Sequence, residues 1–338
     1  MKTIRVEALG ASVSSIGFGC ASLGGRVGSR VGVEALERAY DAGITWYDVA
    51  PSYGDGMAES ICGQFASKKR VRIHICTKVG MRPAATSATM RLLKPIARAS
   101  LTLLPGIQSR LSAMKPKPFK VPLSAELIRT SVEDSLRRLR TDYVDVLALH
   151  RPTREEAVRD DIIRAVERVV QDGKARAVSI AGNSDIGVED LDESSPYRLM
   201  QIANNPLEQN LERLKDAGPK MTFVTYGSFS SVNTLVAKVS GMQHVLKHLH
   251  EIGYRGEPAE IFAAFVVDYA LATNAAGVTL FSMIRKEHLA FNLLRLTRSP
   301  KLNLVNRIAV ELRHAAAAAS ALTVGYRISE AMGLMVGM

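Results

Sequence analysis

Residues 124–150 read Ser124-Ala-Glu-Leu-Ile-Arg-Thr-Ser-Val-Glu-Asp-Ser-Leu-Arg-Arg-Leu-Arg-Thr-Asp-Tyr-Val-Asp-Val-Leu-Ala-Leu-His150 and combine a helix pattern with a strand pattern. Apolar residues recur at helical spacing after Ser124, a good N-cap residue, so a helix is expected over Ser124–Arg140. The short apolar run Val144–Leu149 is typical of a strand that is buried on both faces. A helix followed by such a strand is the unit of a parallel sheet.

The same unit recurs along the chain. Helical patterns at 32–42 and 155–171 each end just before a glycine, which favours a helix C-terminus there. The expected strands are Ile16–Cys20, Ile44–Asp48, Val71–Thr77, Val144–Leu149, Ala175–Ile180, Leu199–Ala203, Met221–Tyr226 and Val278–Phe281. Eight such units predict one closed (β/α)8 TIM barrel, an α/β fold, as a single domain over residues 1–338.

An insertion and a tail interrupt this rhythm. Residues 81–122 separate the third strand from its helix by far more than the 2–6 residues of an ordinary βα loop, and their six prolines exclude one long helix. The insertion falls on the rim that carries active sites in barrels, so it is a lid, a partner surface or a tolerated loop. The tail over residues 300–338 is rich in Ala, and a helix is expected over Leu302–Leu322. That helix either docks on the barrel or forms a subunit contact, which leaves the oligomeric state open.

Composition excludes several classes of protein. Of the 338 residues, 47% are hydrophobic and 23% charged, which is typical of a globular chain. Three cysteines without a C-x-x-C pair make a disulfide framework or a structural zinc unexpected, and we expect no metal site. The first residues lack the apolar core of a secretory signal, and the sequence contains no long apolar run of the kind that spans a membrane. A reduced, soluble, cytoplasmic protein is therefore expected.

The net charge of +11 is local. Thirteen of the 44 Lys and Arg lie in residues 60–125, a segment without Asp or Glu, and the remaining basic residues nearly balance the 33 acidic ones. Such a segment attracts an anionic cofactor, an acidic substrate, nucleic acid or a membrane surface, or is simply a solvated face. Phe119 is its only aromatic residue after Phe65, so base stacking has little support and no nucleic-acid partner is expected.

Four polar side chains of complementary chemistry follow the second, third and fourth expected strands. They are Asp48, Tyr53, Lys78 and His150. The carboxyl ends of parallel strands meet at one end of a barrel, so these groups are expected to converge. A nearby ammonium stabilises a tyrosine phenolate, a carboxylate holds that ammonium in place, and a histidine orients a carbonyl or relays the proton. Taken singly, Asp48 and Lys78 are also compatible with an ordinary buried ion pair, and His150 with a hydrogen-bonded histidine at a strand end.

From Leu9 to about Asn292, apart from residues 81–122, the sequence resembles the aldo-keto reductase family. The motifs that carry the resemblance are Trp46-Tyr-Asp-Val-Ala-Pro-Ser-Tyr-Gly54, Thr77-Lys78 at a strand end, and Ser131-Val-Glu-Asp-Ser-Leu-Arg-Arg-Leu-Arg-Thr-Asp-Tyr-Val-Asp-Val-Leu-Ala-Leu-His150. The resemblance implies a (β/α)8 barrel that uses NADP(H) or NAD(H) without a Rossmann domain. It also implies that Tyr53 donates the proton, that Lys78 and Asp48 adjust the acidity of Tyr53, and that His150 positions the carbonyl oxygen.

The resemblance implies a set of cofactor-binding residues as well. Gln201 matches the glutamine that holds the nicotinamide amide, and Asn292 matches an adenine-binding asparagine. The full expected set is Asp48, Asn183, Gln201, Tyr226, Ser228, Arg285, His288 and Asn292. His288 aligns with the family's arginine for the 2′-phosphate, and Arg285 or Lys286 is a possible substitute. With the basic surroundings, this favours NADP(H) over NAD(H).

Two positions depart from the family's pattern. Its Ser-Asn pair after the fifth strand falls on Ala181-Gly182, or reaches Asn183 with a slip of one residue, and its stacking tyrosine falls on Asn204. The expected function is an NADP(H)-dependent oxidoreductase that interconverts an aldehyde or ketone with its alcohol. The cationic insertion suits a phosphorylated or carboxylated substrate, such as a sugar derivative. The alternative is a cofactor-binding regulatory or scaffold subunit with this fold and little turnover. The departures at Ala181-Gly182 and Asn204 and the long insertion favour this alternative.

Overall fold

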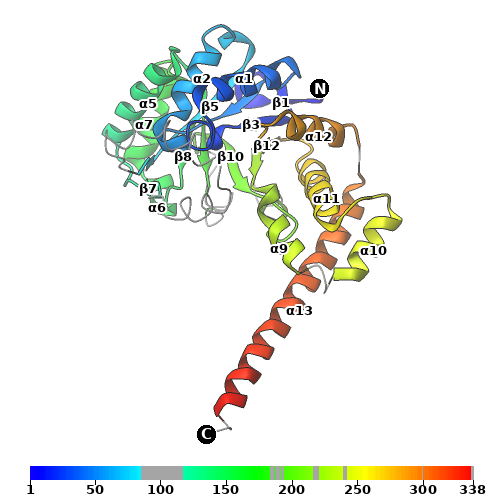
Figure 1. Cartoon of the computed structure of the whole chain (residues 1–338). Helices are drawn as coiled ribbons and strands as arrows, with labels where there is room; N and C mark the ends of the chain where they lie inside the picture. The colour runs from blue at the N-terminus through cyan, green and yellow to red at the C-terminus, as the bar shows by residue number, and fades with distance from the viewer. Residues whose placement is uncertain are drawn as a thin grey trace.

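The computed structural model describes residues 1–84, 117–182, 186, 191, 194–215, 221–238, 242–298 and 300–335. Most of the insertion and Asn183 lie outside the described residues. Within the described residues the strands form a closed, all-parallel barrel in the order β10-β11-β12-β3-β4-β5-β8-β9 (Figure 1). The bounds are β3 Ile16–Gly19, β4 Trp46–Asp48, β5 His74–Val79, β8 Val144–His150, β9 Ala175–Ala181, β10 Tyr197–Ala203, β11 Thr222–Tyr226 and β12 Val278–Phe281. The predicted (β/α)8 barrel is confirmed.

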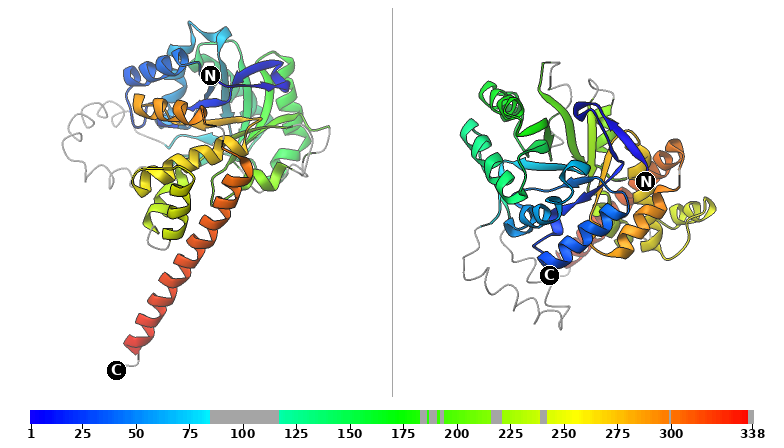
Figure 2. Two further views of the ribbon diagram at one scale, coloured as in Figure 1. Left: turned by 90° about the vertical axis from the view of Figure 1, so that its right-hand side faces the viewer. Right: turned by 90° about the horizontal axis from the view of Figure 1, so that it is seen from above.

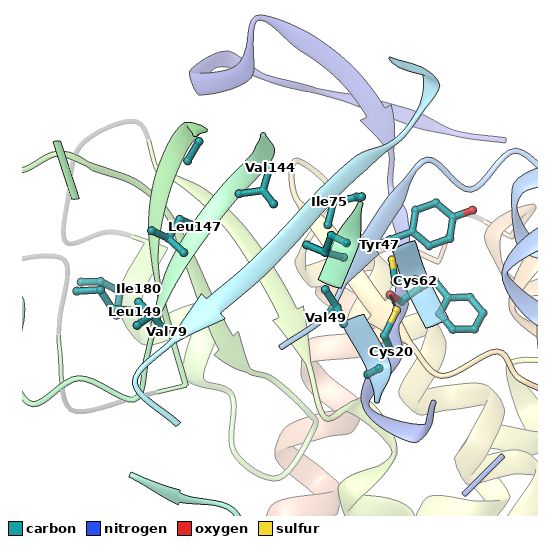
Figure 3. Packing of buried hydrophobic residues seen from close by; sticks show 14 of the residues in the cluster. Cys20, Tyr47, Val49, Cys62, Ile75, Val79, Val144, Leu147, Leu149 and Ile180 are labelled. Atoms are coloured by element: carbon teal, nitrogen blue, oxygen red, sulfur yellow. Dashed lines mark hydrogen bonds between the residues drawn. The ribbon is translucent and has the colours of Figure 1, made fainter. Parts of the chain in front are cut away.

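Alternate residues of each strand face opposite sides of the barrel wall, as the pleat requires. Along β4, Trp46 belongs to the core inside the barrel, whereas Tyr47 packs outward beneath the helices. Figure 3 shows Tyr47 in the outer core beside two buried cysteines, Cys20 and Cys62. Alternate positions along each strand therefore point into the barrel or out toward the helices. At the carboxyl end, Asp48, Lys78 and His150 occupy inward-pointing positions.

A hairpin closes the amino end of the barrel. Strands β1 (Thr3–Val6) and β2 (Ala11–Ser14) pair antiparallel, and Val6 and Val13 join the inner core that contains Trp46. A Cβ at Gly17 would lie 2.8 Å from the Trp46 ring, so only glycine leaves room for this indole. Neither strand of this hairpin was expected from the sequence.

Helices cover the outside of the barrel (Figures 1 and 2). The helix expected after Ser124 is confirmed, and the Ser124 hydroxyl accepts the Leu127 N–H at 3.1 Å as an N-cap. The bounds are α1 Ser29–Asp41, α2 Ala58–Ala66, α5 Ala125–Leu139, α6 Arg154–Val158, α7 Asp160–Gln171, α8 Asn210–Lys215, α9 Val232–Ala237, α10 Gln243–Glu251, α11 Pro258–Thr273, α12 Lys286–Leu296 and α13 Leu302–Met335. None of the described helices is both long and apolar enough to cross a bilayer.

The prediction placed the start of the third strand too early, at Val71. Arg70–Arg72 forms a 3-10 turn, Val71 is 88% exposed, and β5 starts only at His74. The Arg70 guanidinium donates to the Tyr143 carbonyl at 2.9 Å and pairs with Asp145 at 2.8 Å. These contacts hold the turn outside the sheet, and no apolar pattern reveals them. The second strand is likewise shorter than expected and starts at Trp46.

A second hydrophobic cluster lies beside the barrel. Helices α9, α10 and α11 pack with the first part of α13, where Val305, Ile308 and Leu312 are buried. Beyond this cluster α13 extends away from the rest of the molecule (Figures 1 and 2). The predicted tail helix is therefore present and longer than expected, and its first part docks on α11. In the insertion, the described residues Met81–Arg82 (β6) and Phe119–Lys120 (β7) pair antiparallel.

Candidate active site

A cavity of about 550 Å³ opens at the carboxyl end of the barrel strands. Its size is ordinary for a pocket that binds a small organic molecule. The lining residues are Gly19, Ala21, Asp48, Tyr53, Lys78, His150, Arg151, Ala181, Gly182, Gln201, Tyr226, Gly227, Leu280, Phe281 and Ser282. All four expected catalytic side chains are among them.

A buried ion pair forms the floor of the cavity. Asp48 ends β4 and Lys78 lies near the end of β5, and both share the inward parity of their strands. The Lys78 ammonium donates to Asp48 Oδ1 at 2.5 Å and to the Val49 carbonyl at 3.2 Å. Gln201 on β10 donates to the second oxygen, Asp48 Oδ2, at 2.6 Å. Both carboxylate oxygens are therefore bonded, and the lysine side chain is fixed in position.

Charge interactions decide the protonation state of Lys78. Burial has the largest single effect and lowers the pKa of Lys78, because an ammonium loses water inside a protein, but the charge and hydrogen bond of Asp48 together with Tyr53 and Cys76 raise the pKa by more. The net shift is upward, and Lys78 stays an ammonium throughout the range in which proteins function. The cavity thus holds a permanent positive charge beside Tyr53.

Tyr53 begins a 3-10 turn, Tyr53–Gly56, in the loop that follows β4. The Lys78 Nζ lies 4.9 Å from the centre of its ring. Burial raises the pKa of Tyr53, while the charge of Lys78 and a hydrogen bond to it lower the pKa, and the result is about 12. The phenol is therefore protonated at neutral pH and faces the cavity as an acid.

His150 ends β8 and lies against Tyr53. The two ring centroids are 6.0 Å apart, and the rings are nearly perpendicular, at 89°. Burial, and then the charges of Lys78 and Arg151, lower the pKa of His150 to about 3. The imidazole is neutral at pH 7, and a neutral ring offers one N–H donor and one acceptor.

A polar network outside the barrel wall holds the strand that carries Lys78. The Thr77 hydroxyl donates to Glu59 of α2 at 2.6 Å, and Arg138 of α5 donates to the other Glu59 oxygen at 2.6 Å. Thr77 has outward parity, so its side chain locks β5 against two helices while Lys78 enters the cavity. The sequence analysis missed this network, although Glu59 is the last acidic residue before the long basic stretch.

The expected cofactor residues divide into two groups. Gln201 and Tyr226 line the cavity, together with Asp48. Ser228 and Asn292 lie away from its walls. Both are buried, and within the described part of the chain the Ser228 hydroxyl and the Asn292 side-chain carbonyl lack hydrogen-bond partners.

Two further expected residues, Arg285 and His288, lie at the start of α12 and are exposed. Neither of them lines the cavity. Asn183, the alternative to Gly182, falls outside the described residues.

Asn204 serves the fold and does not line the cavity. Its amide donates to the Thr273 hydroxyl at 3.1 Å, and its side-chain oxygen accepts the Leu211 N–H at 3.2 Å. Tyr226 at the end of β11 brings an aromatic ring to the cavity wall, as Tyr53 and Phe281 do. The absence of an aromatic residue at position 204 therefore does not leave the cavity without one.

The sequence analysis overlooked a charged residue of the cavity wall. Arg151 follows His150 directly and lines the same cavity beside Gly182. The motif quoted from the sequence stops at His150, and no spacing marks the next residue as part of a site. Among the described residues no cluster of three or more His, Cys, Asp or Glu is placed to hold a metal ion.

Comparisons with known proteins agree with this geometry. The family model described as the aldo/keto reductase family matches residues 15–293. The chain is 31% identical over 188 residues to a D-threo-aldose 1-dehydrogenase from a Pseudomonas species, covering 51% of each protein. It is 26% identical over 239 residues to an aldo-keto reductase of Bacillus subtilis, covering 68% of this chain and 62% of that one. The matches thus span about half to three fifths of these curated relatives.

Solved structures show the same fold over more of the chain. A glycerol dehydrogenase from Gluconobacter oxydans superposes with a TM-score of 0.69 at 21% identity, over 92% of this chain and 94% of the other. A holo-form aldo-keto reductase from Bacillus halodurans gives 0.64 at 22% identity, over 92% and 96%. Together with the family model, which covers most of the sequence, these findings establish that the chain belongs to the aldo/keto reductase family.

Proposed function

We propose that the protein is a nicotinamide-dependent oxidoreductase that interconverts an aldehyde or ketone with the corresponding alcohol, with Tyr53 as the proton donor. The observation that carries the proposal is the Asp48–Lys78–Tyr53–His150 cluster on the wall of one open cavity. A buried ion pair alone would need no cavity, and a cavity for binding alone would need no acid beside a fixed ammonium.

The residues present suit a nicotinamide dinucleotide. Gln201 is held by Asp48 at the cavity wall, where a carboxamide can pair with the carboxamide of the nicotinamide, and Tyr226 offers an aromatic face. Among the described residues, the buried oxygens of Ser228 and Asn292 have no hydrogen-bond partner. Buried polar groups are rarely left without partners, so these two oxygens support a bound ligand.

The chemistry at the carbonyl follows from the charges in the cavity. When bound, the dihydronicotinamide supplies a hydride. Tyr53 transfers its proton to the carbonyl oxygen as negative charge develops there, and the Lys78 ammonium stabilises the phenolate that remains. His150 is neutral, so its ring N–H can hold the carbonyl oxygen near the phenol without placing a second positive charge there. Charges fixed in advance in this way stabilise a developing oxyanion by about 3–4 kcal/mol per donor.

NADP(H) is proposed over NAD(H) because Arg285, Lys286 and His288 lie close together in the sequence at the start of α12. A 2′-phosphate adds negative charge, and cations near it favour its binding. Names among the relatives, such as D-threo-aldose 1-dehydrogenase, are consistent with a carbonyl or hydroxyl substrate, a sugar derivative among them.

The complete proton-donor cluster favours an enzyme over the alternative of a cofactor-binding regulatory or scaffold subunit. Such a subunit would keep the nucleotide-binding residues but would have no need of Tyr53 beside Lys78. The Asn204 departure does not support it either, because that side chain is bonded inside the fold.

The test is a fluorescence titration with NADPH and NADH, followed by a panel of aldehydes and ketones with whichever cofactor binds. We expect tighter binding of NADPH and measurable consumption of it with at least one carbonyl compound. Binding without turnover across a broad panel would support the regulatory alternative, and failure to bind either nucleotide would overturn both functions.

A further inference from the structure

We propose that Arg151 selects carbonyl substrates that carry an anionic group, a carboxylate or a phosphate, a few bonds from the reacting carbonyl. The inference rests on the proposed function and deepens it. Arg151 lines the cavity immediately after His150, the residue assigned to the carbonyl oxygen. An anionic group on the substrate would reach the guanidinium while the carbonyl stays between His150 and Tyr53.

The backbone is shaped to place this side chain. Arg151 has a φ of 58°, in the left-handed region that residues other than glycine seldom adopt. Its N–H donates to the Ala181 carbonyl at 2.7 Å, which ties the end of β8 to the end of β9. This turn directs the chain out of the strand pattern, so Arg151 and His150 can both face the cavity although they are neighbours.

Gly182 leaves room for the arginine. A Cβ built on Gly182 would lie 2.9 Å from Arg151 Cγ, 3.8 Å from Arg151 Cδ and 3.6 Å from the Tyr226 hydroxyl. The stem of Arg151 and the Tyr226 hydroxyl therefore both lie over a position without a side chain. Any larger residue at 182 would displace the arginine.

The charge of Arg151 has no partner in the described part of the chain. Its guanidinium makes no ion pair or side-chain hydrogen bond with any described residue. The other charges on the cavity wall are Lys78 and Asp48, which neutralise each other at 2.5 Å, and His150 is neutral. Among the described residues that line it, the cavity therefore has one cation without a charged partner, Arg151, whose planar fork matches a carboxylate or phosphate.

The position of Arg151 in the barrel favours the substrate over the cofactor phosphates as its ligand. In the ring of eight strands, β8 lies four places from β12, directly opposite. The residues proposed for the adenosine phosphates, Arg285 and His288, follow β12 on α12. An anion bound by Arg151 is therefore on the far side of the cavity from them and beside the reacting groups.

The experiment compares two aldehydes, 4-formylbenzoate and its neutral methyl ester, in the wild-type protein and three variants. Arg151→Met keeps the stem over Gly182 and removes the charge, Arg151→Lys keeps the charge without the fork, and Arg164→Met removes an exposed arginine on α7 that lies outside the cavity lining. The measured quantity is the ratio of kcat/KM for the acid to kcat/KM for the ester. Differences in intrinsic reactivity between the two aldehydes cancel when this ratio is compared between variants.

We expect Arg151→Met to lower the ratio about tenfold, mainly through KM of the acid, because it removes a charge-assisted hydrogen bond. The ratio for Arg151→Lys should lie between those of the wild type and Arg151→Met, and the ratio for Arg164→Met should equal that of the wild type. Raising the salt concentration should lower the ratio in the wild type but not in Arg151→Met.

Three results would overturn the inference, and they are distinguishable. An unchanged ratio in Arg151→Met, with both aldehydes still reduced, would refute the role of Arg151 and leave the proposed function intact. A weaker NADPH affinity with both aldehydes slowed equally would place the guanidinium on the cofactor phosphates. Failure of the wild type to reduce either aldehyde, or any member of the wider panel, would refute the proposed function and this inference together.

Discussion

Two buried carboxylates lie at opposite ends of the barrel, and both are paired with cations. Asp48 ends β4 at the cavity and pairs with Lys78. Asp145 lies at the start of β8 and forms an ion pair with Arg70 at 2.8 Å, and its oxygens accept from Arg176 at 3.0 Å and from the Ile75 N–H at 2.9 Å. Arg176 also donates to the Leu9 carbonyl at 2.5 Å, so this cluster ties the hairpin to the barrel.

The two ion pairs differ in what the cation of each pair contacts besides the aspartate. Each oxygen of Asp145 is bonded, and its arginines bond backbone carbonyls in turn, so the cluster holds the fold and leaves no group for chemistry. The Lys78 ammonium instead faces Tyr53 and a cavity. In barrels of this kind the carboxyl ends of strands carry function and the amino ends carry stability, and we propose the same division for these two aspartates.

Among the variants that compare the two ion pairs, the largest expected effect comes from removing the cation at the cavity. Lys78→Met should lower turnover about 10²–10³-fold, because the phenolate left on Tyr53 loses its stabilising charge. Steady-state kinetics with saturating cofactor measures this. Turnover within threefold of wild type would show that the ion pair at the cavity is as structural as the one at the other end.

Matched aspartate variants sharpen the comparison directly. Asp145→Asn should lower the free energy of unfolding by about 3–5 kcal/mol, because two arginines lose a buried partner, with little change in turnover per folded molecule. Asp48→Asn should lower turnover at least tenfold, since Lys78 is no longer held. Urea denaturation and kinetics on both variants check this, and equal activity losses in the two would erase the proposed division.

The pH dependence of the two reaction directions tests the state of Tyr53. With a pKa of about 12, the phenol is protonated at neutral pH, so carbonyl reduction should be flat from pH 6 to 9. Alcohol oxidation needs the deprotonated form and should rise about tenfold per pH unit over the same range. Profiles of kcat/KM in both directions measure this, and a flat oxidation profile would argue against Tyr53 as the titrating group.

A smaller effect concerns stability at low pH. The pKa of His150 is lowered by burial from 6.5 to about 3, so the unfolded chain takes up this proton first. The contribution of neutral His150 to stability is complete above pH 6.5 and is lost as the pH falls toward 3, by about 2 kcal/mol at pH 5. His150→Gln should remove that part of the slope in denaturation measured between pH 7 and 5. Identical slopes would show that the histidine is solvated.

The barrel strands and most of the polar residues at their carboxyl ends could be predicted from the sequence. Short apolar runs separated by helical patterns place the barrel strands, and Asp48, Lys78 and His150 follow because a polar residue at the end of an apolar strand has little to do with packing. The hairpin was not predictable in this way, because its strands are short and outside the repeating unit. The start of β5 was missed because the charged side chain of Arg70, not an apolar pattern, sets it.

The less predictable part of the candidate site lies on the β8–β9 side of the cavity. Arg151 faces the cavity through a left-handed backbone and the space over Gly182, and both depend on chain segments that meet only in three dimensions. Asn204 shows the converse: the resemblance puts position 204 where the family has a stacking tyrosine, whereas the hydrogen bonds of Asn204 to Thr273 and Leu211 place it in the fold.

The most direct test of the central claim is the turnover of Tyr53→Phe, measured beside its affinity for the cofactor. The variant keeps the ring against His150 and removes only the hydroxyl. We predict a loss of carbonyl reduction of about 10²–10⁴-fold with nucleotide affinity within a few-fold of the wild type. Undiminished reduction by this variant would contradict the assignment of the phenol beside Lys78 as the acid.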